Sequence, residues 1–439
     1  MQVGSTLIFS GAPPEYEEFR AQVASRLHLV PRYRQKLAEV PLRQGRPVWI
    51  DDPHLNLDYH VREAALPPPG EDPQLRALAG RIFSQRLDRS KPLWELWLVS
   101  GHGDQRFAVI GKTHHCLVDG FSGIDIASVL HDTTPDPTRP TRRPDRWIAD
   151  PEPTGATLLG DALRERATSP AELARTTRAA LRTPSRILSS AFGPISALAN
   201  LLGNSTATPS SPLNVPIGSH RRLAWVDGDL DDLRAIKARH GATVNDVVLA
   251  VVAGALGRYL RARGHSTAEL ELKAMVPISV RQAEELPSLA DRVAAAVAPL
   301  PIWCQDPIER LEVISRTMGD LKGSDDAHAA NLLTELGDFA PPTLAALAAR
   351  LQSRGRPFNL VVTNAPGPQF PLYLLGRQLE TVYPMVPLGE NQAFCVGVIS
   401  YNGRLGFGLT GDYDAMRGID SLAVDFETTI AETIAASAR

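Results

Sequence analysis

One apolar segment followed directly by two histidines constrains this chain more than any other feature. Residues 106–113 are mostly apolar and predict a buried β-strand, whereas residues 124–131 return to helical spacing. Between them, residues 114–120 contain His114, His115, Asp119 and Gly120. The chain is therefore expected to leave a strand, turn and enter a helix at this point. Scaffolds commonly place reactive side chains at such positions.

Consecutive strand residues point to opposite faces, so His114 and His115 are not expected to share an orientation. We expect one ring to be packed or bonded to the backbone and the other to face a cavity. The same alternation would turn Cys116 away from His115. A neutral imidazole accepts a proton from a hydroxyl or thiol near neutral pH, as a general base does. Asp119 could fix the tautomer of the ring or pair with an arginine, and Gly120 suits a turn with positive φ or a close backbone approach.

Other interpretations of the same residues remain open. Two core histidines followed by an Asp-Gly turn would have no chemical role. A metal site is less favoured, because adjacent histidines on a strand diverge and no third His or Glu follows at helical spacing. We therefore predict no metal ligands.

Composition excludes several classes of protein. A net charge of −3 shows no basic excess that would favour nucleic-acid binding. Three cysteines far apart indicate neither a disulfide framework nor a zinc site and favour a reducing cytoplasm. The sequence contains no apolar run of about 18 residues, so no membrane span is predicted. The N-terminus shows no basic-then-apolar signal segment.

A length of 439 residues allows two domains with full cores. We predict an α/β (α+β) fold with an N-terminal domain at residues 1–150, a helical crossover and linker at 151–212, and a C-terminal domain at 213–439. Segments 3–10 and 221–226 predict strands, and 14–29 and 75–85 predict helices, whereas 52–61 predicts extended chain. Basic amphipathic helices are expected within 157–202, where they could pack as a crossover or lie on an anionic membrane surface.

The second half contains one marked helix start. Thr243 is a typical N-cap residue for an apolar helix that extends to residue 263, and Asn245 and Asp246 occupy its first turn. Capping alone could explain these residues. Strands are expected at 272–281 and 358–364, a helix at 344–351, and a hairpin around Asn402-Gly403.

The motif His-His-x-x-x-Asp-Gly resembles the signature of acyltransferases built on the chloramphenicol-acetyltransferase fold. Four further patches, in order, resemble the bacterial wax ester synthase/diacylglycerol acyltransferase family: Pro92-Leu93-Trp94, Asn245-Asp246, Pro277-x-Ser279-x-Arg281 and Asn364-x-Pro366-Gly367-Pro368. Two departures are visible. Where that family usually has Gly-Asn-Arg, this chain has Ala290-Asp291-Arg292. The leading Leu-Ser-x-x-Asp segment that is usual in the family is missing from this sequence.

This resemblance implies two chloramphenicol-acetyltransferase-like domains, each a mixed sheet flanked by helices, with a central channel. It implies an enzyme that moves a long-chain acyl group from acyl-CoA to diacylglycerol, forming triacylglycerol, and to long-chain alcohols, forming wax esters. His115 would be the base and Asn245 the oxyanion donor, with His114 and Asp119 in the same catalytic group. The residues expected to bind substrate or shape loops are Gly120, Asp246, Ser279, Arg281 and Asn364.

No cofactor is expected besides acyl-CoA as co-substrate, and no nucleic-acid partner. The expected location is the cytoplasm, with peripheral contact to the inner face of the plasma membrane or to lipid droplets. Two alternatives remain: a non-catalytic acyl-chain- or lipid-binding protein on the same fold, and an acyltransferase for a non-lipid acceptor, such as a phenolic or carrier-bound one.

Overall fold

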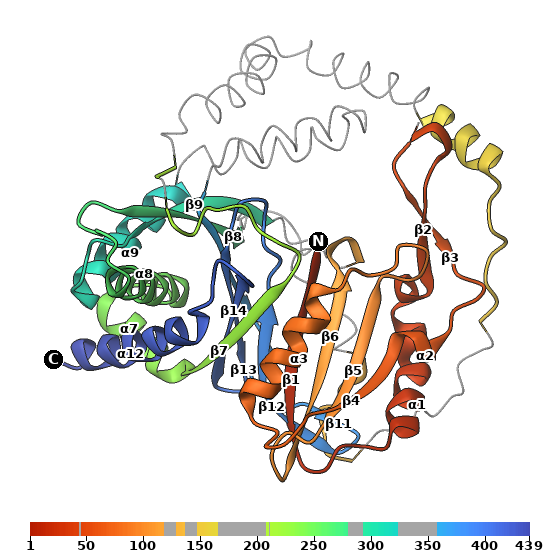
Figure 1. Cartoon of the computed structure of the whole chain (residues 1–439), viewed down its shortest axis with the longest axis horizontal. Coiled ribbons are helices and arrows are strands. Elements are labelled where there is room, and N and C mark those ends of the chain that lie inside the picture. The colour runs from red at the N-terminus through yellow and green to blue at the C-terminus, as the bar shows by residue number, and fades with distance from the viewer. Residues whose placement is uncertain are drawn as a thin grey trace.

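The computed structural model describes residues 1–43, 45–117, 129–136, 147–165, 208–209, 211–279, 293–323 and 358–439. In these residues the strands form two six-stranded sheets and one two-stranded sheet. The two large sheets stand next to each other, and the N-terminus lies between them (Figure 1). The predicted mixed α/β fold is confirmed.

The first sheet has the order β11-β12-β1-β6-β5-β4. Its strands are β1 Gln2–Ser10, β4 Val61–Ala65, β5 Trp94–Ser100, β6 Arg106–His114, β11 Tyr373–Leu374 and β12 Arg377–Met385. β1 pairs antiparallel with both β6 and β12, and β4 runs parallel to β5. The strands predicted at 3–10 and 106–113 are confirmed. Two strands that complete this sheet come from the second half of the chain, more than 350 residues after β1.

Three helices accompany this sheet: α1 Tyr16–Arg26, α2 Leu57–His60 and α3 Asp72–Ser84. The helices predicted near residues 14–29 and 75–85 are thus confirmed. The prediction of extended chain at 52–61 is wrong in part, because α2 is a helical turn there. The Asn56 side chain accepts a hydrogen bond from the Asp58 N–H and so caps that turn. The two-stranded sheet pairs β2 Gln35–Ala38 with β3 Val48–Asp51.

The second sheet has the order β7-β14-β13-β10-β8-β9. Its strands are β7 Arg221–Asp229, β8 Glu271–Ser279, β9 Val293–Pro301, β10 Leu360–Pro366, β13 Phe394–Tyr401 and β14 Arg404–Asp412. The helices α7 Leu230–His240, α8 Val244–Ala262, α9 Pro307–Gly323 and α12 Ile419–Ser437 gather on one side of it (Figure 1). The predicted hairpin forms around Asn402 and Gly403, both of which have positive φ.

Helix α8 forms the centre of the largest core. Thr243 and Asp246 form a capping box at its start, as the sequence predicted for Thr243. Residues 246–257 are all buried, because α8 packs against the sheet as well as against α9 and α12. This part of α8 has no solvent-facing side, which explains why it carries apolar residues all round rather than on one side only.

The two large sheets contact each other through β12 and β14. A Cβ atom at Gly406 would lie 2.0 Å from the Val382 carbonyl oxygen, and one at Gly408 would lie 1.7 Å from that of Pro384. Glycine is therefore needed at both positions for the strands to approach. The rings of Trp225 and Tyr383 also stack across the junction, with centroids 4.8 Å apart.

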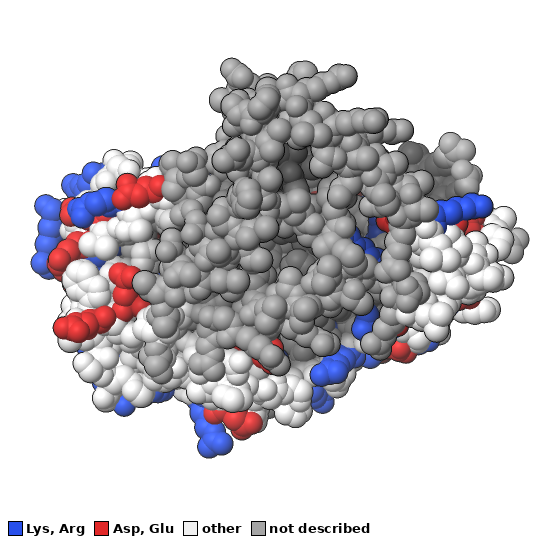
Figure 2. All heavy atoms as spheres, turned by 90° about the horizontal axis from the view of Figure 1, so that it is seen from above, with Lys and Arg blue, Asp and Glu red and all other residues white. Residues whose placement is uncertain are grey.

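In the ranges described above, no single helix is long and apolar enough to cross a bilayer. Only α7 and α8 meet that criterion as a pair, and they are bent by 103°. On the face drawn in Figure 2, the basic and acidic side chains of the described residues are interspersed. Of the helices predicted within 157–202, the part up to residue 165 is helical, whereas 166–202 and the helix predicted at 344–351 lie outside the described residues.

Candidate active site

The two histidines lie where β6 ends at the edge of the sheet junction. β6 stops at His114, and His115–Leu117 form one 3₁₀ turn. The His114 N–H donates to the Leu93 carbonyl at 2.9 Å, and the His115 N–H donates to the Met1 carbonyl at 3.0 Å. Backbone bonds from two neighbouring segments therefore hold both residues. Asp119 and Gly120 lie outside the described residues.

His114 is half-buried and bonded at both ring nitrogens. Its Nδ1 accepts from the Cys116 N–H at 3.3 Å and lies 3.0 Å from Cys116 Sγ, and its Nε2 lies 3.2 Å from the Met1 amino nitrogen. Burial, followed by the positive charges of the N-terminus and Arg89, lowers the pKa of His114 to about 4. The ring is therefore neutral at pH 7.

His115 has a different environment. Its side chain is exposed, and its imidazole has no hydrogen-bond partner among the residues that the structure describes. The two rings do differ in environment, but the ring that is bonded to the backbone, His114, is also the one that lines a cleft, so the expected division into one bonded ring and one cavity-facing ring is not seen. The argument that placed Cys116 was wrong, however, because the strand ends at His114, and Cys116 Sγ contacts His114 instead.

A cleft of about 790 Å³ lies beside His114, and we call it the histidine cleft. Both halves of the chain line it: Met1, Gln2, Phe83, Ser84, Arg86, Leu87, Arg89, His114, Ile217, Gly218, Ser219, Arg221, Met385, Val386, Pro387, Leu388 and Thr410. Its described lining contains three arginines and no Asp or Glu, so it is positively charged. Apolar side chains such as Ile217, Met385 and Leu388 make up much of the remainder, which suits a long organic substrate with an anionic part.

The site residues predicted in the second half of the chain lie on three different elements, α8, β8 and β10. Asn245 is half-buried in the first turn of α8, whereas Asp246 is buried and its carboxylate accepts the Thr243 N–H at 2.8 Å. Asp246 therefore caps the helix. Asn364 is half-buried in β10, and Ser279 is the last residue of β8. Because β8 and β10 are parallel, their ends point to the same edge of the sheet.

The structure thus places His114 in the lining of the cleft, whereas His115, the next residue in the chain, and Asn245, Ser279 and Asn364 do not line it. Arg281 lies outside the described residues. Sequence reasoning missed Arg86 and Arg89. A usable signal was present, since both arginines lie a few residues before the Pro92-Leu93-Trp94 patch, on either side of the buried Leu87.

Comparison with known proteins gives consistent results. Residues 1–248 match the family model of the wax ester synthase/diacylglycerol acyltransferase catalytic domain, and residues 290–433 match that of the C-terminal domain of the same family. A probable diacylglycerol O-acyltransferase of Mycobacterium tuberculosis is 33% identical over 450 residues, covering 98% of this chain and 94% of the relative. A second one from this organism is 29% identical over 447 residues, covering 100% of this chain and 92% of the relative.

Among solved structures, the wax ester synthase/diacylglycerol acyltransferase from Marinobacter aquaeolei VT8 aligns with a TM-score of 0.69 and 28% identity. The alignment covers 100% of this chain and 95% of that one. The starter condensation domain of rhizomide synthetase aligns with a TM-score of 0.57 and 15% identity, covering 100% of this chain and 89% of that domain. The latter similarity concerns the fold alone.

Proposed function

Because the chain belongs to the wax ester synthase/diacylglycerol acyltransferase family, we propose that it transfers a long-chain acyl group from acyl-CoA to diacylglycerol, forming triacylglycerol. Long-chain alcohols would serve as second acceptors and yield wax esters, as the name of the Marinobacter relative suggests. One observation carries the proposal: within the segment that matches the family's catalytic model, β6 ends at His114 in the lining of a cleft that both halves of the chain form, and the exposed His115 follows directly.

We assign the general base to His115. Its imidazole is exposed and not engaged by described neighbours, so it can take the proton of the acceptor hydroxyl as the oxygen attacks the thioester carbonyl. The C–S bond then breaks, and the proton passes from His115 to the departing CoA thiolate. The acyl group moves directly between the two substrates without a covalent bond to the protein.

His114 has a positioning role in this scheme. Its neutral ring is bonded to the Cys116 backbone and so holds the 3₁₀ turn that carries His115. The tetrahedral oxyanion needs a hydrogen-bond donor, and we assign it to the side-chain amide of Asn245. Asp119 would fix the histidine loop. Gly120, Ser279, Arg281 and Asn364 would shape the substrate loops.

We propose no cofactor besides acyl-CoA, since proton transfer by an imidazole and displacement of a thiolate need none. Diacylglycerol resides in lipid phases rather than in water. The protein would therefore work in the cytoplasm and bind peripherally to a membrane or lipid-droplet surface.

A product assay tests the proposal. Purified protein with palmitoyl-CoA and either dioleoylglycerol or hexadecanol should form triacylglycerol or wax ester, measured by mass spectrometry. His115→Ala should lower kcat by at least about 100-fold, because general-base catalysis is worth that much. His28→Ala is the matched control, since His28 is an exposed histidine in a different part of the chain, outside the turn His115–Leu117.

Three results would contradict the assignments. Full activity of His115→Ala would remove the base. Tight palmitoyl-CoA binding with no CoA release by the wild type would favour a non-catalytic lipid-binding protein, and release with a phenolic acceptor alone would identify another acyltransferase.

A further inference from the structure

A second hollow adjoins the histidine cleft, and we call it the arginine groove. It has a volume of about 830 Å³ and lies between α3, the start of β7 and the start of α12. Its polar and aromatic lining includes Arg76, Arg81, His220, Arg222, Tyr413 and Asp420. Ser84 and Arg221 line both hollows, so the two meet at this pair.

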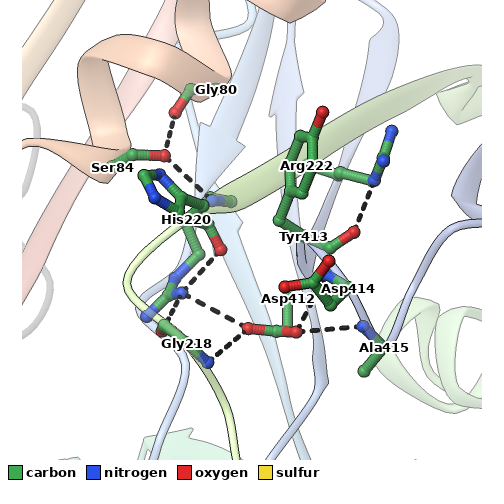
Figure 3. A network of polar contacts seen from close by, with 10 residues as sticks. Gly80, Ser84, Gly218, His220, Arg222, Asp412, Tyr413, Asp414 and Ala415 are labelled. Carbon is green, nitrogen blue, oxygen red and sulfur yellow. Dashed lines mark hydrogen bonds and ion pairs between the residues drawn. The ribbon is translucent and has the colours of Figure 1, made fainter.

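A network of polar contacts forms the boundary between the two hollows, as Figure 3 shows. Ser84 Oγ accepts the Arg221 N–H at 2.9 Å and donates to the Gly80 carbonyl at 2.6 Å, which ties α3 to β7. The buried Asp412 carboxylate accepts the Gly218 N–H at 2.8 Å and lies 3.8 Å from the Arg221 guanidinium. A ligand that crosses from one hollow to the other would meet a preformed surface.

The arginine groove carries uncompensated positive charge. Arg76 forms an ion pair with Asp420, in which Arg76 Nη1 lies 2.9 Å from Asp420 Oδ1. In contrast, neither Arg81 nor Arg222 has a carboxylate within ion-pair distance in the described parts of the chain. Arg81 also has no hydrogen-bond partner there, and Arg222 donates only to the Tyr413 carbonyl, at 2.6 Å. Neither guanidinium group is thus neutralised by a described carboxylate, and the planar N–H donors that remain on both suit phosphate.

The groove also presents an aromatic surface. Tyr413 is 45% exposed, the Arg222 guanidinium lies 3.8 Å from its ring centroid, and the His220 ring approaches it edge-on at 6.2 Å. An exposed aromatic ring beside arginines is the combination that proteins use to stack a nucleobase and bind its phosphates. The chemistry of this groove therefore fits a phosphorylated nucleoside better than a simple anion.

We propose that the arginine groove binds the phosphoadenosine end of acyl-CoA, with Arg81 and Arg222 contacting phosphates and Tyr413 contacting the adenine. This inference rests on the proposed function for its choice of nucleotide. The pantetheine arm would pass over the contact between Ser84 and Arg221 into the histidine cleft and deliver the thioester to the histidines.

The arginines of the histidine cleft are less suited to this task. Arg89 lies close enough to lower the pKa of His114. Phosphates bound there would occupy the place where the thioester must react, since the pantetheine arm separates the two groups. The arginine groove lies beyond Ser84, away from His114, and so leaves room for that arm.

Binding measured without turnover tests the inference. Calorimetry with free CoA and with 3′,5′-bisphosphoadenosine should show a Kd about tenfold higher for Arg81→Ala and for Arg222→Ala than for the wild type. In the acyltransferase assay, the KM for palmitoyl-CoA should rise similarly, with kcat and the KM for dioleoylglycerol unchanged. Arg234→Ala, on the exposed surface of α7, is the matched control.

Several outcomes would overturn the inference. Unchanged CoA affinity in folded Arg81→Ala and Arg222→Ala would exclude the groove, and a loss confined to Arg86→Ala or Arg89→Ala would place the phosphates in the histidine cleft. If Arg81→Ala lost binding to phosphatidylglycerol vesicles but kept CoA affinity, the groove would hold a lipid headgroup. CoA binding through Arg81 with no transferred acyl group would instead contradict only the proposed function.

Discussion

His114 remains neutral in the folded chain because desolvation disfavours its charged form, and this has a consequence for stability. Its pKa falls from 6.5 to about 4 on folding, so between these values the unfolded chain binds more protons than the native one. The stabilising contribution is complete above pH 6.5 and is lost as the pH falls toward 4.

The corresponding prediction concerns His114→Asn. This variant should lose less stability than the wild type between pH 7.5 and pH 4.5, because it removes the group whose protonation opposes folding. Urea unfolding at both pH values measures the difference. The exposed His28 serves as control through His28→Asn, and an identical pH dependence of His114→Asn and wild type would refute the assigned environment.

Asn245 and Asp246 are neighbours with different predicted roles, and a pair of variants separates them. Asn245→Ala should lower kcat by about 100-fold, the usual loss for an oxyanion donor, with little effect on stability. Asp246→Ala should cost about 1 kcal/mol of stability through the lost capping box. Activity assays and urea unfolding on both variants decide the matter. An Asn245→Ala variant with wild-type kcat would leave the oxyanion without its assigned donor.

At the scale of elements, β12 and β14 can approach each other only because Gly406 and Gly408 of β14 have no side chain. Gly408→Ala would force a methyl group against the Pro384 carbonyl oxygen. We expect a loss of about 1–3 kcal/mol, typical of overpacking, measured as a lower urea midpoint. Gly160→Ala is the control, because Gly160 is exposed in the helical segment 155–165 with nothing within 4 Å of an added Cβ. It should be neutral or stabilising, and equal destabilisation by both changes would contradict the argument.

For the whole molecule, the strand order predicts that the halves depend on each other. β12 supplies one of the two neighbours of β1, so a fragment of residues 1–212 would expose a long strand edge. We expect this fragment alone to aggregate or remain unfolded, and the full chain to unfold in one cooperative transition. Circular dichroism and calorimetry measure both. A soluble fragment with a sharp transition of its own would show that the first sheet is stable without β12.

The proposed domain boundaries at 150 and 212 remain a prediction. The exchange of β11 and β12 into the first sheet means that any boundary drawn along the sequence cuts through a shared sheet. Function follows the same pattern, because the histidine cleft combines Arg86 and His114 with Ile217 and Leu388 from the other half.

The sequence by itself determined the features with a local cause. The apolar run before His114 specified β6, Thr243 and Asp246 specified the start of α8, and Asn402-Gly403 specified a hairpin, since periodicity, capping and turn preferences act over a few residues. The resemblance of ordered motifs added the family and the two histidines.

Only the tertiary structure decided which distant segments meet. The pairing of β12 with β1, the glycine contact with β14, and the grouping of Arg81, Arg222 and Tyr413 join residues separated by up to several hundred positions. No local preference encodes such contacts, because they form when two large cores pack and bury their common surface. The helical turn α2 was missed for a local reason. The sequence pattern around it favours extended chain, but the Asn56 side chain caps a helical turn there.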